Sequence, residues 1–436
     1  MRKTILWIFV LALSVRAIIA ILQMTYGINN GINLDQYLYG PFNPGFEIYH
    51  DFYYYYVTQL AELSKGLIPY TQIPTYAYPP LFLYSLYPFY LLGGSFSASI
   101  PIWLTDAATA PLVYLVARHF TSSKLSFIAG VSYAISPFFL LYEGYLWFSS
   151  QPMTFFVILS FYLLIKKRPI WASAVFAIAV LFKQEVIFVF PIYLIWLYTR
   201  FGRPIFFRGL IITCSIILAV SVPFLLISPG LYLYVMSYGV IPSSVFASSH
   251  LSNSNTISQI TSPLASSTSL SCSTISNTWR SLICNYGDLT YTDSKFVASW
   301  TTIFSASFMN LISTWIFVPL LAVTSYNFIR LRKDPSILLL SASLISTTML
   351  ALFSYQVHPI YRYYLLPVYV MPLVVSRSRL SMSLAITLPL VSLIFPSGFA
   401  QLLFPLLDCL TVVLFNQKST VAVENGVVPF SSPTMP

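Results

Sequence analysis

Charged residues are scarce in this chain of 436 residues, where Lys, Arg, Asp and Glu together make up only 8%. Soluble globular domains carry about 25% of charged residues, so the composition excludes an ordinary soluble domain. The charges are also unequal, with 22 basic and 12 acidic residues and a net charge of +10. Because the basic residues stand in short clusters between apolar runs, they indicate membrane topology and give no reason to expect nucleic acid as a partner.

Cysteine is equally rare, with four residues in the whole chain. Cys214 and Cys409 fall within apolar runs and are expected to pack as small side chains. Cys272 and Cys284 fall in a long polar loop, where an outer compartment would allow a disulfide, and two free thiols are the alternative. No pair has the spacing of metal ligands, so no metal site is predicted.

The chain has no internal repeat that we can defend, which weakens the case for a secondary transporter. What is abundant is hydrophobic and aromatic sequence, at 57% and 17% of the residues. Apolar runs long enough to cross a hydrocarbon core of ~30 Å recur along the chain. We therefore predict an all-α, polytopic membrane protein of about 12 transmembrane helices. The expected spans lie near 4–24, 98–117, 125–146, 152–165, 169–182, 186–199, 209–228, 301–325, 336–354, 363–376, 380–395 and 399–416.

Short basic clusters separate these runs and hold 16 of the 22 Lys and Arg residues. Placing all the clusters in the cytoplasm puts both termini there and predicts a multi-pass protein of the cell membrane. Residues 1–24 contain Arg16 and no convincing cleavage site, so they are expected to stay as a signal anchor. Pro79–Gly93 cannot cross the membrane without inverting this pattern, and we expect it to form a juxtamembrane or re-entrant helix on the outer side.

This layout divides the chain into regions. Residues 1–230 form a transmembrane module with a large first outer loop at 25–97, and 229–300 form an outer loop rich in Ser and Thr. Residues 301–416 hold the C-terminal transmembrane helices, and 417–436 form a cytoplasmic tail. Polar residues gather in five segments along the predicted outer rim of the membrane.

The first rim segment is "HDFYYYY", in which His50 and Asp51 precede Tyr53–Tyr56. It opens an amphipathic helix that is expected to end at Gly66, and capping of this helix is the alternative role for Asp51. The second segment is "PTYAYPPLFLY", in which Tyr78 precedes two prolines that favour the start of a helix.

The next two segments put ionisable groups at the ends of apolar helices, where such groups are costly and are functional candidates by default. One is "YEGYLWFSSQP", at the end of the third expected span. The other is "LFKQEVIF", a polar hairpin tip for which a plain turn is the alternative. Their candidate residues are Glu143, Trp147, Gln151, Lys183, Gln184 and Glu185.

The fifth segment, "YQVHPIYRYYLLP", brings His358 and Arg362 to the predicted outer face. Together with Lys183, they are three of very few potential cations on that side. Such a group suits an anionic headgroup, for example a phosphodiester. Snorkelling of these side chains at the membrane interface is the alternative.

Taken in order, these segments resemble the GT-C superfamily of membrane glycosyltransferases, which use a polyprenyl-phosphate sugar as donor. The likeness is to the group related to the second mannosyltransferase of GPI-anchor synthesis. That group has an Asp after the first span, then G-x-x-x-Y, N-Y-P-P-L, W-G-Q-x-D and K-P-Q. The matching residues, within about the first 230, are Asp51, Gly66 with Tyr70, Tyr78 to Leu81, Trp147 with Gln151, and Lys183 with Gln184.

Two motifs depart from the family pattern. No Asp follows Gln151, and Lys183 is followed directly by Gln184 and Glu185 without the proline. Candidates for the missing second acid are Asp106, Glu143 and Glu185.

The resemblance implies a GT-C-like fold with outer juxtamembrane helices in the first loop. It also implies an inverting transfer of a hexose, with mannose expected, from a polyprenyl or dolichyl phosphate to a lipid- or glycan-linked acceptor at the outer face. Asp51 would be the general base, and Tyr53–Tyr56 with Trp147 would form walls that stack on sugar or contact lipid. The expected binding residues are His50, Tyr54, Tyr78, Trp147, Gln151, Lys183, Gln184, His358 and Arg362.

Other functions fit the sequence less well. The lack of a phosphate-binding loop for a nucleotide sugar favours a lipid-linked donor, and no cofactor is expected. A divalent metal held by Asp51 and a second carboxylate is not favoured, because no paired Asp motif is present. A multi-pass transporter or flippase of an amphipathic or lipid-linked substrate is the alternative function. Oligosaccharyl transfer to protein is disfavoured, because the "W-W-D-Y-G" motif of that GT-C branch is absent.

Overall fold

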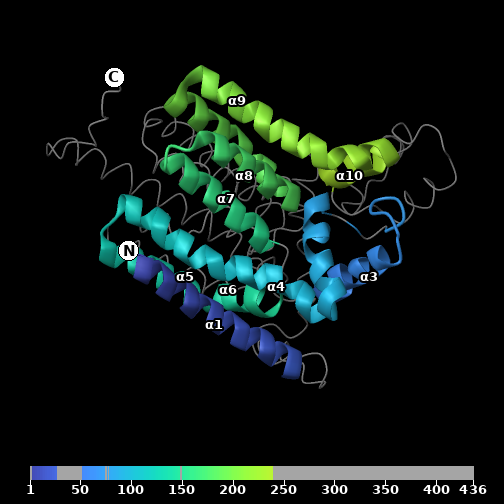
Figure 1. Cartoon of the computed structure of the whole chain (residues 1–436), viewed down its shortest axis with the longest axis horizontal. Helices are drawn as coiled ribbons and strands as arrows, with labels where there is room; N and C mark the ends of the chain where they lie inside the picture. The colour runs from blue at the N-terminus through green and yellow to red at the C-terminus, as the bar shows by residue number, and fades with distance from the viewer. Residues whose placement is uncertain (1, 27–51, 74–75, 77, 148–149, 239–436) are drawn as a thin grey trace, which may run out of the picture.

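The computed structural model describes residues 2–26, 52–73, 76, 78–147 and 150–238, and the structural statements below concern these residues (Figure 1). The predicted spans beyond residue 300 lie outside them, as do Cys272 and Cys284.

The described part of the chain is helical and contains no strand. Three of its helices are long and apolar enough to cross a membrane, which confirms a helical membrane architecture, and α7 and α8 are shorter apolar helices. The predicted total of about 12 spans is not tested by these residues. The main helices are α1 (Arg2–Tyr26), α4 (Pro80–Phe120), α5 (Ser123–Ile135), α7 (Ser150–Ile165), α8 (Pro169–Phe182) and α9 (Phe190–Ile227).

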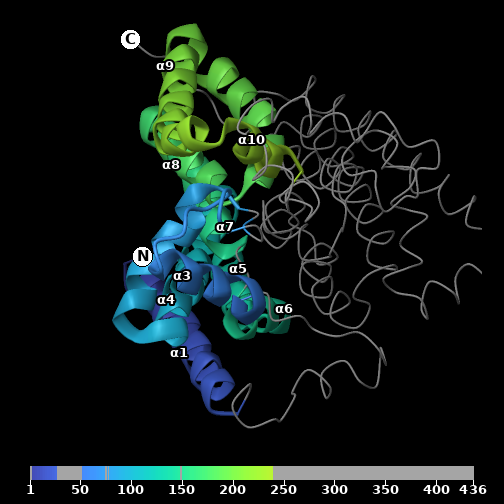
Figure 2. The ribbon, with the colours of Figure 1, turned by 90° about the vertical axis from the view of Figure 1, so that its right-hand side faces the viewer.

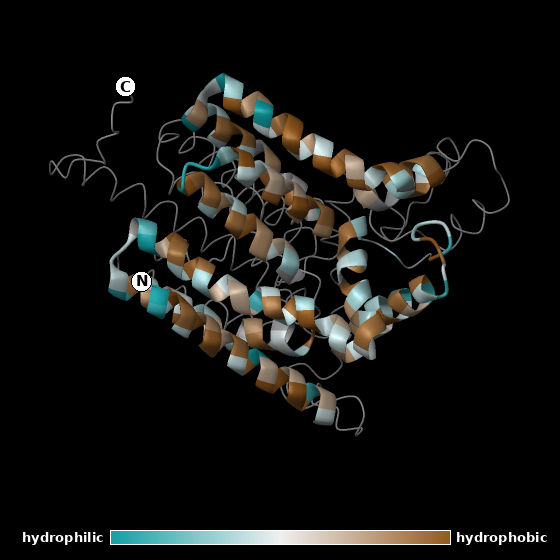
Figure 3. Ribbon diagram, viewed as in Figure 1, coloured by the Kyte–Doolittle hydropathy of each residue, from teal (hydrophilic) through white to brown (hydrophobic). Residues whose placement is uncertain are grey.

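Helices that follow one another in the sequence pack side by side. Helix α4 lies between α1 and α5 on one side and α7 on the other, and α8 lies between α7 and α9. In Figure 2 the helices form a narrow column that runs from α1 to α9. The core between them is apolar, whereas the outward faces of α1 and α9 expose large side chains such as Trp7, Ile211 and Leu226. Figure 3 shows this apolar sequence along both helices, as expected for surfaces that face lipid.

The basic turns lie along one side of this column (Figure 1). The start of α1, the α4–α5 turn, the α7–α8 turn and the bend of α9 all lie toward the left of Figures 1 and 3. They carry the clusters from Arg2 to Arg208 that the positive-inside pattern assigns to one side of the membrane. Their common position agrees with the predicted order of the crossings, and which compartment they face remains a prediction.

Glycines separate the long helices into straight segments. In α4, Gly93 and Gly94 have non-helical dihedrals, and Gly94 has a φ of 68° that favours glycine. The helix that starts at Pro80 therefore ends near these glycines and changes direction before the predicted span at 98–117 (Figure 1). A separate helix over Pro79–Gly93 was predicted, and its position relative to the membrane remains a prediction. In α9, Gly202 has a φ of 77° and marks the bend between the expected spans.

The third expected span, 125–146, is wrong as a continuous helix. Helix α5 ends at Ile135, because Pro137 disfavours a helical conformation at Ser136, whose ψ is 120°. Pro137 then starts the short helix α6 (Pro137–Phe139), which continues as the π-helix η3 (Leu140–Tyr145). The expected span 186–199 also begins differently, with a 3₁₀ helix η4 (Gln184–Val189) before α9.

Short helices form the side of the column opposite the basic turns (Figure 1). After the first predicted outer loop, the chain forms the π-helix η2 (Phe52–Val57) and helix α3 (Thr58–Ser64). Gly66 ends this region with a φ of 84°, and its N–H donates to the Leu63 carbonyl at 2.9 Å. An amphipathic helix ending at Gly66 was predicted, and the structure agrees. Helix α10 (Pro229–Tyr238) follows α9 on the same side.

Candidate functional site

The tyrosine run after Asp51 forms a π-helix, a conformation that is rare and often found at functional sites. This winding buries Phe52 and Tyr56 completely, leaves Tyr53 half-buried and exposes Tyr55. Tyr54 belongs to the same π-helix. The run is therefore a mixture of core and surface residues, where the sequence had suggested a uniform aromatic wall.

Trp147 packs against the start of this π-helix. Its ring centroid lies 5.0 Å from that of Phe52 in an edge-to-face arrangement, and 5.9 Å from that of Tyr53. A third contact is with Phe96 of α4, whose ring centroid lies 6.3 Å from that of Trp147. Two motifs of the family pattern, the segment after Asp51 and the segment of Trp147, therefore meet in space.

This packing surrounds the Trp147 side chain. Trp147 is fully buried, and its role in a wall that stacks on sugar or contacts lipid stays a prediction. Its backbone is also unusual, because a φ of 52° is strained for a residue with a large side chain.

Tyr78 joins the next two motifs. Its hydroxyl lies 3.2 Å from the hydroxyl of Tyr56, and its carbonyl accepts a hydrogen bond of 2.7 Å from the hydroxyl of Tyr70. Tyr76 donates in the same way to the Pro79 carbonyl at 2.7 Å. Burial raises the pKa of Tyr70 and of Tyr76 well above the usual phenol value, so both hydroxyls stay protonated and act as hydrogen-bond donors.

The same tyrosines fix the first loop to the last described helices. The Tyr70 ring lies 5.3 Å from Phe224 of α9 and 5.1 Å from Tyr232 of α10. Tyr232 in turn shares a hydrogen bond of 2.6 Å with Ser221. The "G-L-I-P-Y" and "Y-P-P-L" motifs thus have a structural function, since they lock a loop between distant parts of the chain.

Lys183 and Gln184 lie at a separate junction, between α8 and η4. Lys183 follows the last residue of α8 in an extended conformation and is only 4% exposed. This agrees with the predicted polar tip between two apolar segments. Trp147 and Tyr78 both contact aromatic side chains of η2 and so belong to one group. Lys183 and Gln184 lie at the end of a different helix, α8. Of the remaining candidates, Glu143 lies in η3, Gln151 in the first turn of α7 and Glu185 in η4.

Several predicted site residues lie outside the described residues: His50, Asp51, His358 and Arg362. Within the part of the chain that the structure describes, no group of three or more His, Cys, Asp or Glu side chains could hold a metal ion.

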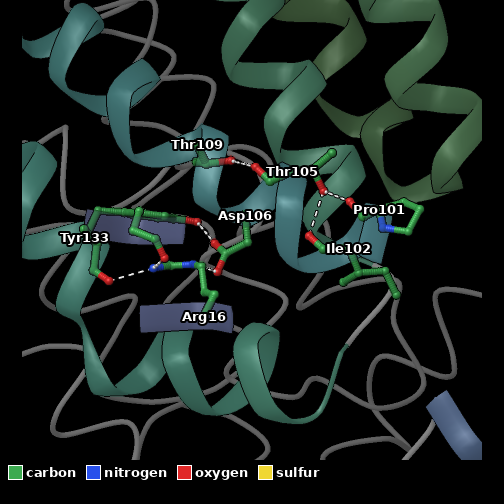
Figure 4. Close-up of polar contacts among 9 residues, drawn as sticks. Arg16, Pro101, Ile102, Thr105, Asp106, Thr109 and Tyr133 are labelled. Carbon is green, nitrogen blue, oxygen red and sulfur yellow. Dashed lines mark hydrogen bonds and ion pairs between the residues drawn. The ribbon is translucent and has the colours of Figure 1, made fainter. Parts of the chain in front are cut away.

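A fully buried ion pair joins two of the described helices (Figure 4). Arg16 of α1 pairs through Nε with Oδ2 of Asp106 in α4, and both side chains are fully buried. The hydroxyl of Tyr133 in α5 donates to Asp106 Oδ1 at 2.8 Å. Arg16 Nη1 donates to the Ala134 carbonyl at 2.6 Å, near the C-terminal end of α5, where free carbonyls attract a cation.

This network gives Asp106 a structural role, and its candidacy as the second acid stays a prediction. Both of its oxygens are engaged, one by Arg16 and the other by Tyr133. The residue therefore holds α1, α4 and α5 together. The sequence contained the signal, because Arg16 and Asp106 are isolated charges in apolar helices and such charges usually pair. Sequence analysis also overlooked Gln23, a buried amide near the end of α1 that accepts a hydrogen bond of 3.4 Å from Tyr53.

No protein family model and no curated protein matches this sequence. Among solved structures, the chain is similar to the oligosaccharyltransferase of Archaeoglobus fulgidus in its apo form, with 13% identity and a TM-score of 0.41. The match covers 94% of this chain and 56% of that enzyme. The same enzyme, archaeal AglB, in complex with an inhibitory peptide and a dolichol-phosphate gives 13% identity and a TM-score of 0.39 over the same shares. With a tethered acceptor peptide containing the NVT sequon, the TM-score is 0.40 at 13% identity, over 94% and 55% of the two chains. The chain thus spans just over half the length of the enzyme it is similar to.

Proposed function

We propose that this chain is an inverting membrane glycosyltransferase. In this proposal it moves a hexose, with mannose expected, from a polyprenyl or dolichyl phosphate to a lipid- or glycan-linked acceptor at the outer face of the membrane. The observation that carries the proposal is the packing of Trp147 against Phe52. It supports the idea that motifs far apart in the sequence serve one site.

Asp51 is the proposed general base. It directly precedes Phe52 in the sequence, and the Phe52 ring contacts Trp147. The carboxylate would take the proton of an acceptor hydroxyl while that oxygen attacks the anomeric carbon. One C–O bond forms as the bond from the anomeric carbon to the phosphate oxygen breaks, and the lipid phosphate leaves. A single displacement of this kind inverts the anomeric configuration.

Cations are proposed to stabilise the departing phosphate. Lys183 is buried at the end of α8, where an ammonium group acts more strongly than in bulk water. His358 and Arg362 are proposed to complete this group. Further contacts with sugar or lipid are proposed for His50, Tyr54, Tyr78, Gln151 and Gln184. No cofactor is part of the proposal.

The test is the transfer of mannose by the purified chain, with Asp51→Asn compared with the wild type. A general base typically contributes about 10²–10⁴-fold, so the variant should lose activity on that scale while its melting temperature stays unchanged. Asp35→Asn is the matched control, since Asp35 lies in the same predicted loop and is expected to be solvated. Full activity of a folded Asp51→Asn variant removes Asp51 from this role. Movement of the lipid between vesicle leaflets without formation of a glycoside supports the flippase alternative.

A further inference from the structure

Two buried hydrogen-bond donors at the rim have no acceptor among the described residues. They are Nε1 of the Trp147 indole and Nε2 of the Gln23 amide. Trp147 is 0% and Gln23 1% exposed, so bulk water does not satisfy them. Most buried polar groups in native proteins are hydrogen-bonded, and an exception needs an explanation.

Both donors belong to one cluster. The Tyr53 hydroxyl donates to Gln23 Oε1 at 3.4 Å, and the Tyr53 ring lies 5.9 Å from the Trp147 ring. Three chain segments that are distant in sequence therefore converge here: the end of α1, the π-helix η2 and the short segment after η3. Because Tyr53 is only half-buried, the cluster reaches the protein surface through this residue. We call Gln23, Tyr53 and Trp147 the donor cluster.

The backbone conformation of the donor cluster also indicates a binding site. Trp147 holds a φ of 52°, and Tyr53 lies in a π-helix. Strained dihedrals persist only where the surroundings impose them, and they gather at ligand-binding sites. Removing an unsatisfied donor or relaxing this turn would stabilise the isolated protein, so their presence suggests a use in binding.

The chemistry of the missing partner follows from the groups that lack it. An indole N–H donates only, and an amide nitrogen also donates only. The ligand must therefore supply acceptor oxygens, and a negatively charged oxygen forms the stronger hydrogen bonds. A phosphate offers several such oxygens in a compact group.

We propose that the donor cluster binds the oxygens of a phosphate group, with Gln23 Nε2 and Trp147 Nε1 as the donors. The assignment of this phosphate to a lipid headgroup rests on the proposed function. The binding of a phosphate group by the donor cluster does not depend on it. The cluster thus positions the phosphate beside η2, at the residue that follows Asp51 in the chain.

The test measures binding to the purified full chain in detergent. The probes are dolichyl phosphate, dolichol without phosphate, and inorganic phosphate. The variants are Gln23→Met, which removes the donors at nearly constant size, Gln23→Glu, which adds a negative charge, and Trp147→Phe. Trp196→Phe is the control, since Trp196 is another buried tryptophan that packs against Phe161 of α7, away from the donor cluster.

Gln23→Met and Trp147→Phe are expected to weaken dolichyl phosphate binding by about 10-fold to 100-fold each, the usual effect of one hydrogen bond to a charged group. Gln23→Glu should weaken it further, and the control should bind as the wild type does. Without ligand, Trp147→Phe should melt no lower than Trp196→Phe. Binding of inorganic phosphate alone, with the same dependence on the variants, supports the site and makes free phosphate its ligand.

Either of two results overturns the inference. In one, the variants bind dolichyl phosphate as tightly as the wild type, or dolichol binds as tightly as its phosphate. In the other, Trp147→Phe melts several degrees lower than Trp196→Phe without ligand, which shows that the indole N–H already has an internal acceptor. The outcome is separable from the proposed function: weakened phosphate binding in a chain that transfers no sugar leaves the site standing and refutes the enzyme.

Discussion

Replacing Asp106 by Asn is the sharpest structural test of the helix arrangement. Asn has nearly the size of Asp, so the packing between α1, α4 and α5 stays the same and only the charge is lost. Arg16 then remains fully buried without its countercharge. Breaking a buried ion pair by removing one partner typically destabilises a protein by about 3–5 kcal/mol. We expect a loss of that size for Asp106→Asn.

Replacing the whole network tests the same reasoning from the other side. In the triple variant Arg16→Met, Asp106→Leu, Tyr133→Phe, no buried charge and no orphaned hydroxyl is left. Apolar replacement of a buried ion pair is often neutral or stabilising, and the freed Ala134 carbonyl should cost about 1–3 kcal/mol. The triple variant should therefore be more stable than Asp106→Asn, although it carries more substitutions.

The assay is reversible unfolding of the purified chain in mixed micelles by a denaturing detergent, with the free energy of unfolding compared among variants. Lys124→Gln is the control, because Lys124 is an exposed charge with no ion pair among the described residues and should change stability by less than about 0.5 kcal/mol. An Asp106→Asn variant within that margin of the wild type would refute the buried pair. A triple variant less stable than Asp106→Asn would refute the electrostatic explanation.

Four further predictions concern other parts of the structure. Tyr70→Phe removes the hydrogen bond to the Tyr78 carbonyl and should lower the free energy of unfolding by about 1 kcal/mol; an unchanged value would show that the loop is held by ring packing alone. Because burial raises the pKa of Tyr70 above its usual 10.0, the unfolded chain loses this proton first, so stability should fall as the pH rises above about 10. This fall should be smaller in Tyr70→Phe when unfolding is followed against pH, and an equal fall would contradict the assignment. Gly209→Ala places a methyl group 2.7 Å from Ser173 Oγ and 2.8 Å from Leu197 Cδ1, and overpacking of this kind between α8 and α9 should cost about 1–3 kcal/mol. Gly66→Ala, where no atom lies within 4 Å, tests the backbone instead and should cost about 1 kcal/mol through its positive φ; a thermal melt without change would contradict either expectation.

The helices that span residues 2–26 and 150–182 were predictable because their apolar runs are long and their ends are marked by charges or proline. The break at Pro137 was missed because hydrophobicity continues through it, although a proline in mid-span is a known signal for the end of a helix. The helix over Pro79–Gly93 was found through the charge pattern, which a helix-propensity argument alone would not have shown.

The candidate site was predictable in its composition and less so in its geometry. That the segments of Asp51 and Trp147 belong to one site follows from the order of the motifs, but the burial of Trp147 depends on Phe52, Tyr53 and Phe96, which lie far from it in the sequence. Local patterns carry no information about such contacts. The pairing of Gln23 with Tyr53 was missed for the same reason, because the sequence around a single amide in an apolar helix does not indicate which residue it contacts.

The anomeric configuration of the product tests the central claim most directly. Purified chain would be given dolichyl phosphate mannose and a lipid-linked acceptor, and the new glycosidic bond would be examined by NMR spectroscopy. Our account predicts a glycoside of the configuration opposite to that of the donor, formed by the wild type and by Asp35→Asn and lost in Asp51→Asn. A glycoside that retains the donor configuration, or equal transfer by Asp51→Asn, would contradict it.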